Sequence, residues 1–242
     1  MTEPLITLSD LTVRTRRESM VLFAVEHLAL APGSRTVIMG PSGAGKSMLL
    51  QALSGQLPGT LMRTGARITS AALGRIGFVP QRGTDALHPL IPIGTQVSLV
   101  SRADSAEVAR AFRSVGLDPG SLMDRRPAEL SGGQAQRAAI ALAFLGSPAL
   151  VIADEPTSAL DGETRDETLA IFRGLSAQAG SALVVATHDP VVPGRLEADR
   201  IDVSQGRIQG FSSWTATPAS TPVTSAKPAS PSQALPTTAV PA

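Results

Sequence analysis

The sequence predicts an α/β fold, in which helices pack on both faces of a mostly parallel sheet. Four short, largely apolar runs are typical of strands buried on both faces, and they occupy residues 36–39, 75–79, 150–153 and 182–186. A glycine-rich loop joins the first of these strands to a helical pattern. Residues 90–147 contain helical patterns only, which indicates a helical subdomain inserted between the second and third strands.

The loop after the first strand matches the pattern G-x-x-x-x-G-K-[ST] at every fixed position. Its glycines permit backbone angles closed to other residues, so that consecutive N–H groups can turn inward around an anion. The lysine adds a compact positive charge, and the serine hydroxyl is a suitable ligand for Mg²⁺. The predicted phosphate-binding residues are Gly40, Pro41, Ser42, Gly43, Ala44, Gly45, Lys46, Ser47 and Met48. This loop predicts a site for ATP or GTP.

The residues after the loop have the spacing of a helix. Met48, Leu49, Leu50 and Leu53 recur at helical intervals, and Gly55 is positioned to end the helix. A helix that begins at the loop places its partial positive charge beside the phosphates. The alternative is a glycine-rich turn without a ligand. The flanking strand and helix favour the phosphate site over that alternative.

Two carboxylates follow the apolar strand at residues 150–153. In parallel sheets, ligands bind at the edge where the carboxyl ends of the strands lie. Asp154 is suited to hold Mg²⁺ there, directly or through water, and Glu155 is placed to polarise an attacking water. An acidic surface turn is the alternative. The phosphate loop favours the catalytic interpretation.

Two more strands end in residues of the same kind. Gln81 follows the strand at 75–79 and can act as donor and acceptor at once. His188 follows the strand at 182–186 and can donate to a phosphate oxygen. A histidine alone is more often structural, and the position at a strand end reverses that preference for His188.

A second cluster of serine and glycine precedes a helical run at residues 135–145. The cluster consists of Ser131, Gly132, Gly133 and Gln134. A serine and two glycines at a helix start can form a second anion-binding nest. A plain capped helix is the alternative interpretation of this cluster.

Composition excludes several classes of protein. The chain has 242 residues, of which 43% are hydrophobic, and this is enough for a sizeable core. A net charge of +1 gives no basic face for nucleic acid, and the lack of cysteine excludes disulfides and thiolate metal sites. The N-terminus has no signal-peptide pattern, and the longest apolar stretch, residues 138–153, is interrupted at Gly146. We therefore expect a cytosolic location.

The chain ends in a segment of different composition. After Phe211, Ser, Thr, Pro and Ala dominate, and such a segment cannot bury enough apolar surface to order itself. We predict that residues 212–242 form a disordered tail. Trp214 lies at its base, where it can either contact the domain or remain solvated.

Taken together, residues 5–211 resemble the ATP-binding-cassette (ABC) ATPases, the nucleotide-binding subunits of ABC transporters. The match covers GPSGAGKS as Walker A, Gln81 as the Q-loop, LSGGQ as the family motif, LVIADEP as Walker B and His188 as the switch histidine. SALD, which ends at Asp161, looks like the D-loop. The resemblance implies a P-loop NTPase core with a mostly parallel sheet, an N-terminal antiparallel β portion and an inserted helical subdomain at about 90–147, all within an ABC ATPase domain at 1–211.

The resemblance also implies ATP hydrolysis with Mg²⁺. The implied catalytic residues are Lys46, Gln81, Glu155 and His188, and the implied metal ligands are Ser47, Gln81 and Asp154. Glu155 would be the general base, and His188 would hold the γ-phosphate. In a head-to-tail dimer, the Lys46 loop of one subunit and the Ser131 motif of the other would sandwich one ATP, with Asp161 at the same interface.

The implied partners are transmembrane permease subunits, a second ATPase subunit in a homo- or heterodimer and, indirectly, a solute-binding protein. The permeases would dock near Gln81 at the cytoplasmic face of the cell membrane, and no nucleic acid is expected. The segment RGTDALHPLIPIGTQV after Gln81 looks like the corresponding segment of peptide and nickel importer ATPases. The predicted function is thus the ATP-hydrolysing subunit of an importer of peptides, nickel or a related small solute.

Three other functions compete with the importer. An exporter or lipid-extraction ATPase would use the same chemistry. A soluble ABC ATPase acting on ribosomes or DNA usually carries a second cassette or a long coiled coil. Intact Lys46, Asp154, Glu155 and His188 argue against a non-catalytic binding module.

The chain departs from the family pattern at several positions. Family members usually stack an aromatic ring, often Tyr, on adenine, whereas this chain has no Tyr and carries Arg14, Arg16 and Arg17 near that place. Either an arginine or another residue such as Phe23 would then cover the base. Ala135 replaces a long polar residue. The folded C-terminal extension of peptide-importer ATPases has no counterpart here.

Overall fold

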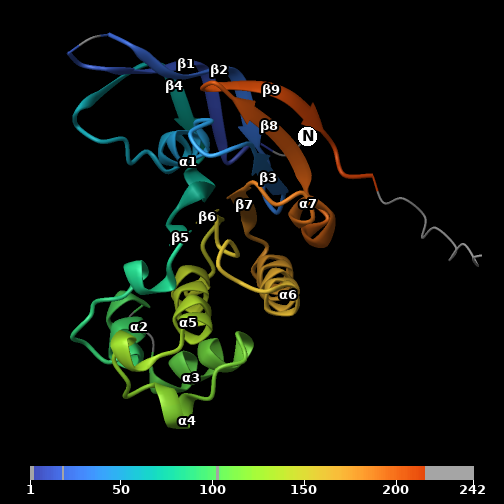
Figure 1. Cartoon of the computed structure of the whole chain (residues 1–242). Coiled ribbons are helices and arrows are strands. Elements are labelled where there is room, and N and C mark those ends of the chain that lie inside the picture. Colours follow the sequence, from blue (N-terminus) through green and yellow to red (C-terminus); the bar gives the residue numbers. More distant parts are fainter. Residues whose placement is uncertain (1–2, 18, 102–103, 216–242) are drawn as a thin grey trace, which may run out of the picture.

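The strands of the chain join in one mixed sheet with helices on both faces (Figure 1). The structure is a computed structural model, which describes residues 3–17, 19–101 and 104–215. The strands are β1 (Ile6–Thr15), β2 (Val21–Leu30), β3 (Arg35–Met39), β4 (Leu61–Thr69), β5 (Ile76–Val79), β6 (Leu150–Asp154), β7 (Ala182–Thr187), β8 (Asp199–Ser204) and β9 (Arg207–Ser212). The helices are α1 (Lys46–Ser54), α2 (Ile93–Ser101), α3 (Ser105–Ser114), α4 (Pro119–Leu122), α5 (Gly132–Phe144), α6 (Gly162–Ala179) and α7 (Val192–Leu196), with 3₁₀ turns η1 (Ala71–Leu73), η2 (Gly83–Ala86) and η3 (Pro127–Glu129). The predicted α/β fold is confirmed.

The sheet has a parallel part and an antiparallel part. Its strand order is β4-β1-β2-β9-β8-β3-β7-β6-β5. The strands β8, β3, β7, β6 and β5 pair in parallel. At the other end, β1 pairs antiparallel with both β2 and β4. The antiparallel N-terminal portion implied by the family resemblance is therefore confirmed.

The parallel strands are buried on both faces because their side chains alternate between two hydrophobic cores. On β6, Leu150 and Ile152 belong to the core that also contains the apolar residues of α1. Val151 and Ala153 belong to the core shared with α5 and α6. This arrangement explains why β6 is a continuous apolar run. The strand continues to Asp154, one residue beyond the prediction, because Asp154 still pairs in register with β7.

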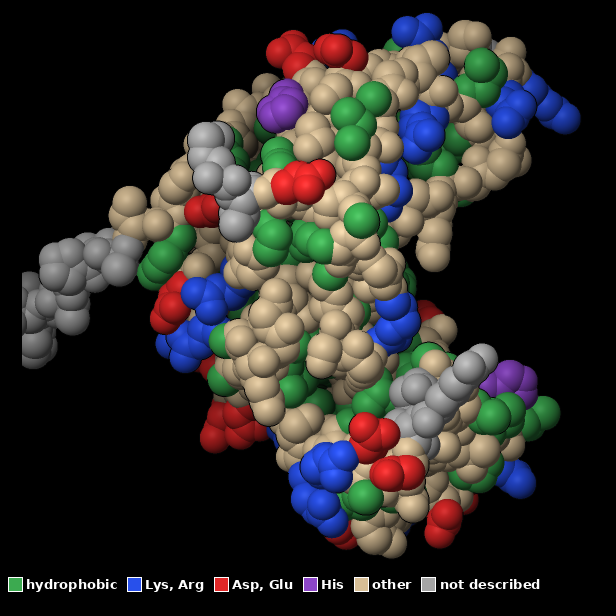
Figure 2. Space-filling model, turned by 180° about the vertical axis from the view of Figure 1, so that it is seen from behind, with side chains coloured by type: hydrophobic (Ala, Val, Ile, Leu, Met, Phe, Trp, Pro, Cys, Tyr) green, Lys and Arg blue, Asp and Glu red, His purple; other side chains and the backbone are tan. Residues whose placement is uncertain are grey.

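The residues between β5 and β6 form a helical part of the molecule. Val108 and Phe112 of α3 and the following Val115 are fully buried, in the same core as α5. Helix α2 ends at Ser101, and Arg102 lies outside the described residues. Figure 1 shows this helical part below the sheet, and Figure 2 shows from behind a hollow between the two.

The strand β5 passes against the backbone of α5 at Gly77. A Cβ atom at Gly77 would lie 2.2 Å from the carbonyl oxygen of Ala143. Because both contacting groups are backbone, Gly77→Ala is expected to force β5 and α5 apart and to lower the free energy of unfolding by about 1–3 kcal/mol. Chemical denaturation measures this loss.

Gly174→Ala in α6 is the matched control for Gly77→Ala. A Cβ atom at Gly174 would meet no atom within 4 Å. Alanine is the better helix former, so this variant should be as stable as the wild type or more stable, by up to about 1 kcal/mol. Equal stability of the two variants would contradict the proposed close approach at Gly77.

The described C-terminal residues extend slightly beyond the predicted domain. Strand β9 ends at Ser212, and the backbone N–H of Trp214 donates to Asp199 Oδ1 at 2.8 Å. Residues 216–242 of the predicted tail lie outside the described residues. Across the part of the chain that is described, no helix combines the length and apolar character that crossing a bilayer requires.

Candidate functional site

The glycine-rich loop lies between β3 and α1 and has the backbone that its sequence predicts. Gly43 and Gly45 have φ values of 77° and 107°, in the left-handed region that favours glycine. Gly40 is required for a different reason, because a Cβ atom there would lie 2.3 Å from the carbonyl oxygen of Val203 in β8. Helix α1 begins at Lys46 and ends at Ser54, and Gly55 caps it in the left-handed conformation, at the position where the sequence predicts the stop.

A hairpin turn that the sequence analysis missed supports this loop. The turn joins β8 to β9 through Gln205 and Gly206, both with positive φ. The N–H of Gly206 donates to the carbonyl of Ala44 at 2.9 Å, and its carbonyl accepts from the N–H of Ala24 at 2.7 Å. The turn therefore ties the loop to β2. The dipeptide Gln205-Gly206 was a turn signal in the sequence, but its partner was not readable.

Lys46 is held inside the loop. Only 6% of the residue is exposed, and Nζ donates to the carbonyl oxygens of Gly40 at 2.8 Å and Pro41 at 3.2 Å. The same atom lies 3.1 Å from Glu155 Oε1. A buried cation is stable only with such partners. The lysine charge is thus held against the backbone of the loop and is paired there with a carboxylate.

Glu155 lies between two nitrogen groups at the end of β6. Besides Lys46, it contacts His188 Nδ1 through Oε2 at 3.0 Å, and the hydroxyl of Thr187 donates to Oε2 at 3.3 Å. The φ of Glu155 is 44°, which is uncommon for this residue type. A backbone hydrogen bond of 2.8 Å to the carbonyl of Ala186 fixes that conformation. The structure brings together the predicted residues Lys46, Glu155 and His188.

Ser47 and Asp154 form a second contact beside this cluster. The Ser47 hydroxyl donates to Asp154 Oδ2 at 2.7 Å. Burial raises the pKa of Asp154; the Ser47 hydrogen bond acts against this shift, Glu155 adds to it, and Lys46 opposes it. The two side chains present hydroxyl and carboxylate oxygens, which are the ligands that Mg²⁺ prefers. This donor set fits a magnesium ion.

The raised pKa of Asp154 predicts how its neutralisation affects stability. A folded-state pKa above the ordinary 3.8 means that the folded protein binds this proton more tightly than the unfolded chain does. The stability contributed by the protonated form is lost as the pH rises from 3.8 through the raised pKa. At neutral pH, Asp154→Asn should therefore raise the melting temperature of the nucleotide-free protein.

Asp161→Asn is the control of opposite sign. Hydrogen bonds from the Thr164 N–H and hydroxyl lower the pKa of Asp161, so its ionised form stabilises the protein above 3.8. Its neutralisation should lower the melting temperature at neutral pH. Thermal denaturation without nucleotide measures both variants, and a drop for Asp154→Asn would contradict the interpretation of its burial.

The remaining predicted residues lie in other contacts. Gln81 Nε2 donates to the hydroxyl of Ser158 at 3.3 Å, so Gln81 is not held on Ser47 or Asp154. Ser131 caps α5: its hydroxyl accepts from the N–H of Gln134 at 3.2 Å, and Gln134 Oε1 accepts from the N–H of Ser131. This is the capped helix considered as the alternative. Among the described residues, no hydrogen bond or ion pair joins this motif to the phosphate loop.

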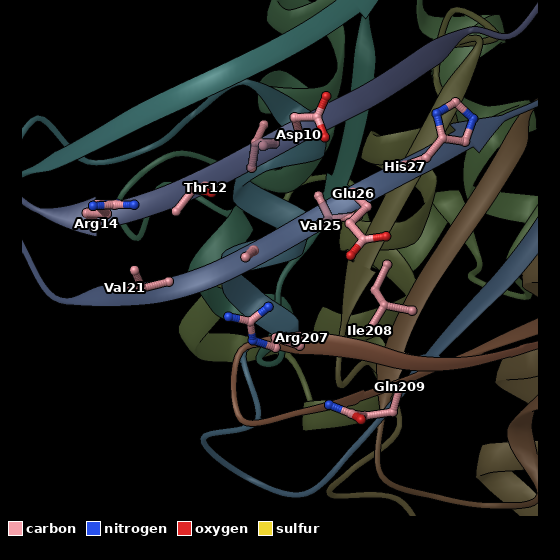
Figure 3. Close-up of a pocket in the computed structure, with 12 residues that line it drawn as sticks. Asp10, Thr12, Arg14, Val21, Val25, Glu26, His27, Arg207, Ile208 and Gln209 are labelled. Carbon is pink, nitrogen blue, oxygen red and sulfur yellow. The ribbon is translucent and has the colours of Figure 1, made fainter.

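Two hollows share Gln209 of β9 in their lining, and one of them lies beside the loop. One, of about 720 Å³, is lined by Gly40, Pro41, Ser42 and His188 together with residues of β8. The other, of about 670 Å³, lies over β1, β2 and β9, and Figure 3 shows Arg14 on its wall. No residue of the phosphate loop lines the second hollow.

The structure decides one question about the missing aromatic ring. Phe23 is fully buried, and a Cβ atom on Gly45 would lie 3.1 Å from its ring. The ring therefore packs beneath the loop, where it is closed to a purine. The alternative that Phe23 covers the base is wrong. Ala135 is also buried, beside the backbone of Gly83, where a Cβ atom would lie 2.4 Å from Ala135.

Comparisons with known proteins identify relatives of the chain. The profile of the family described as ABC transporter matches residues 25–158. An Fe(3+) ions import ATP-binding protein of Rhodococcus jostii is 40% identical over 201 residues, which cover 78% of this chain and 55% of that protein. A thiamine import ATP-binding protein of Jannaschia sp. is 38% identical, over 73% of this chain and 80% of that protein. A lipoprotein-releasing system ATP-binding protein of Anaeromyxobacter dehalogenans is 39% identical, over 78% of this chain and 84% of that protein.

Solved structures agree with this relationship. A dimeric bacterial ABC transporter cassette has a TM-score of 0.73 and 27% identity, over 88% of this chain and all of that chain. A dimeric ATP-binding cassette in a post-hydrolysis state, bound to ADP and Pi, has a TM-score of 0.72 at the same identity and coverage. The fold and the order of the elements are thus those of proteins that have been seen with nucleotide and as dimers.

Proposed function

Because the chain belongs to the ABC transporter family, in which ATP hydrolysis powers transport, we propose that it is the ATPase subunit of an importer of a small solute. It would act at the cytoplasmic face of the membrane as a peripheral subunit. The observation that carries the proposal is the contact of Glu155 with both Lys46 and His188. Groups of the kind that phosphoryl transfer requires are therefore in contact beside the phosphate loop.

The geometry supports a role for each residue in hydrolysis. The free N–H groups of the loop, to which Pro41 contributes none, would surround the β- and γ-phosphates, and Lys46 would exchange Glu155 for phosphate oxygens. Ser47 and Asp154 would hold Mg²⁺, which would supply charge neutralisation at the phosphates. Glu155, freed from Lys46, accepts the proton of the attacking water, and His188 donates to the γ-phosphate. The side chain of Gln81 donates its hydrogen bond to the hydroxyl of Ser158, outside this group of contacts.

A second ATPase subunit completes this site in the proposal. The Ser131 motif is capped on its own helix and makes no bond to the phosphate loop of its own chain within the described residues. A helix N-terminus with free N–H groups is suited to a phosphate, which a second copy or a homologous subunit would present. The dimeric state of the solved cassettes supports this arrangement.

The permease subunit would dock beside the helical part. A hollow of about 230 Å³ there is lined by apolar residues, among them Phe78, Pro80, Val100 and Leu142, and by the charged residues Arg75 and Asp85. Phe78 is 48% exposed, and an exposed aromatic ring with charged residues at its side is typical of an interaction site. This position, next to Gln81, would link docking to the nucleotide site.

The identity of the transported solute is the most specific part of the proposal. The segment RGTDALHPLIPIGTQV supports a peptide or nickel importer, whereas the named import relatives carry Fe(3+), thiamine or zinc. The lipoprotein-releasing relative favours a second candidate, an export or lipid-extraction ATPase. Co-purification from the native cell, followed by identification of the membrane proteins and of the solute that stimulates ATP hydrolysis, separates these candidates.

Phe78→Asp tests the docking surface within the same experiment. Loss of the aromatic ring and a new negative charge in the hollow should reduce recovery of the permease by about tenfold or more, since interface aromatics often contribute 2 kcal/mol or more. Ile68→Asp on β4, where Ile68 is 60% exposed, is the control and should leave recovery unchanged. Equal recovery with both variants would exclude docking at Phe78.

A further inference from the structure

A chain of alternating charges joins α6 to the loop that carries His188. Arg165 of α6 contacts Asp189, the residue after His188, through Nη1 and Oδ2 at 3.3 Å. Its Nε and Nη2 also lie 3.1 Å from Oδ1 of Asp166. The other oxygen of Asp166 lies 2.7 Å from Arg195 of α7. Ion pairs thus connect α6 to the loop between β7 and α7, through Asp189, and to α7 itself, through Arg195.

Asp189 controls the shape of the histidine loop. Its N–H donates to the Thr187 hydroxyl at 3.1 Å, and its Oδ1 accepts from the N–H of Val191 at 2.9 Å. The first bond closes a turn around His188, and the second, which the carboxylate makes, closes the next turn over Pro190. The Oδ2 atom is the one that receives Arg165. The arginine therefore fixes the orientation of the carboxylate on which this turn is built.

Arg165 is itself firmly placed. Its side chain is 23% exposed, so the ion pairs are less screened than those on the open surface. The neighbouring Asp166 raises the pKa of Arg165, and burial acts against that shift. The backbone N–H of Arg165 donates to the carbonyl of Asp161, the residue that caps α6. Arg165 is thus bonded to Asp161 on one side and to the histidine loop on the other.

We propose that Arg165 is a positioning residue that holds His188 in place through Asp189 and links the start of α6 to the switch histidine. The proposal rests on the proposed role of His188 in hydrolysis. Arg165 makes no contact with the phosphate loop in the structure, so its removal should affect turnover far more than nucleotide binding. The partner it acts on is the His188 ring, which makes contacts with Glu155 at 3.0 and 3.1 Å.

The first test compares kinetics. Arg165→Ala should lower kcat for ATP by about tenfold to a hundredfold, because a displaced catalytic group loses alignment, with KM for ATP changed less than about twofold. Arg165→Lys keeps the charge and should recover part of the loss. In an Asp189→Asn background, Arg165→Ala should cause little further loss. Additive losses, or a wild-type kcat in Arg165→Ala, would overturn the proposal.

The second test observes His188 directly and needs no ATPase activity. The chain has 3 histidines, His27, His88 and His188, so their ring signals can be separated by NMR, with His188→Gln for assignment. Arg165→Ala should shift or broaden the His188 signals and leave the other two unchanged. Unchanged His188 signals would overturn the positioning role, whereas a wild-type protein without ATPase activity would overturn the proposed function.

Arg173→Ala is the matched control for both measurements. Arg173 lies on the same helix and pairs with Glu197 at 2.8 Å, away from the histidine loop. Its removal deletes an ion pair between α6 and the residue after α7 without touching Asp189. Wild-type kcat and unchanged His188 signals are expected. If the effects of Arg165→Ala came from a general loss of α6 packing, Arg173→Ala would change kcat and the His188 signals in the same way. That result would also overturn the proposal.

Discussion

Replacing Lys46 with methionine is expected to lower ATP turnover by at least about a hundredfold. Methionine preserves most of the buried, unbranched stem and removes only the charge, which supplies positive potential at the β- and γ-phosphates. The structure also predicts weaker ATP binding, because the carbonyls of Gly40 and Pro41 already hold Nζ within the loop that would receive the phosphates. Steady-state ATPase assays and nucleotide titration of the purified protein measure the two effects.

Arg35→Met is a suitable control for the lysine variant. Arg35 lies at the start of β3, the strand whose other end enters the phosphate loop, and it pairs with Glu197 at 3.2 Å. The change removes a charge of the same sign from the strand that precedes the phosphate loop and should leave turnover within about twofold of the wild type. Near-wild-type turnover with Lys46→Met would contradict the assignment of the loop.

The parallel core and most of the candidate site were predictable because their signals are local. An apolar run such as residues 150–153 is stable in water-excluding surroundings on both faces, so the strand and its burial within a parallel sheet follow from composition. The residues that follow such strands then share one edge. For this reason Glu155 and His188, 33 residues apart, were predicted at one site and are in contact.

The contacts that could not be predicted depend on long-range register. Gly206 reaches the phosphate loop only because β9 returns beside β2. The ion pair between Lys46 and Glu155 depends on the positive φ of Glu155, which the Ala186 carbonyl imposes across the sheet. Phe23 was considered a residue that could cover the base, yet the fold buries it below Gly45. Each of these results from pairing between distant segments, which no short pattern contains.

Glu155→Gln is expected to abolish turnover while strengthening ATP binding. Glutamine preserves the shape of the side chain but cannot accept a proton from water, so kcat should fall by about a hundredfold to ten-thousandfold. The stronger binding follows from the structure, because Glu155 Oε1 lies 3.1 Å from the same Lys46 Nζ that ATP requires. In the variant, Lys46 has no ion pair with residue 155 to break before it binds the phosphates, so less free energy is lost on binding.

The expected gain in ATP binding distinguishes competition between Glu155 and ATP for Lys46 from a simple loss of the general base. ATP titration should give a lower Kd for Glu155→Gln than for the wild type, and size-exclusion chromatography with ATP should show a dimer that persists without hydrolysis. Glu167→Gln is the control: it makes the same chemical change in an ion pair with Arg137, where Glu167 is 56% exposed, and should alter neither quantity. Unchanged or weaker ATP binding by Glu155→Gln would show that the contact between Lys46 and Glu155 does not compete with nucleotide. A variant that still hydrolyses ATP at the wild-type rate would remove Glu155 from the role of general base, and another residue near the end of β7 would then have to accept the proton.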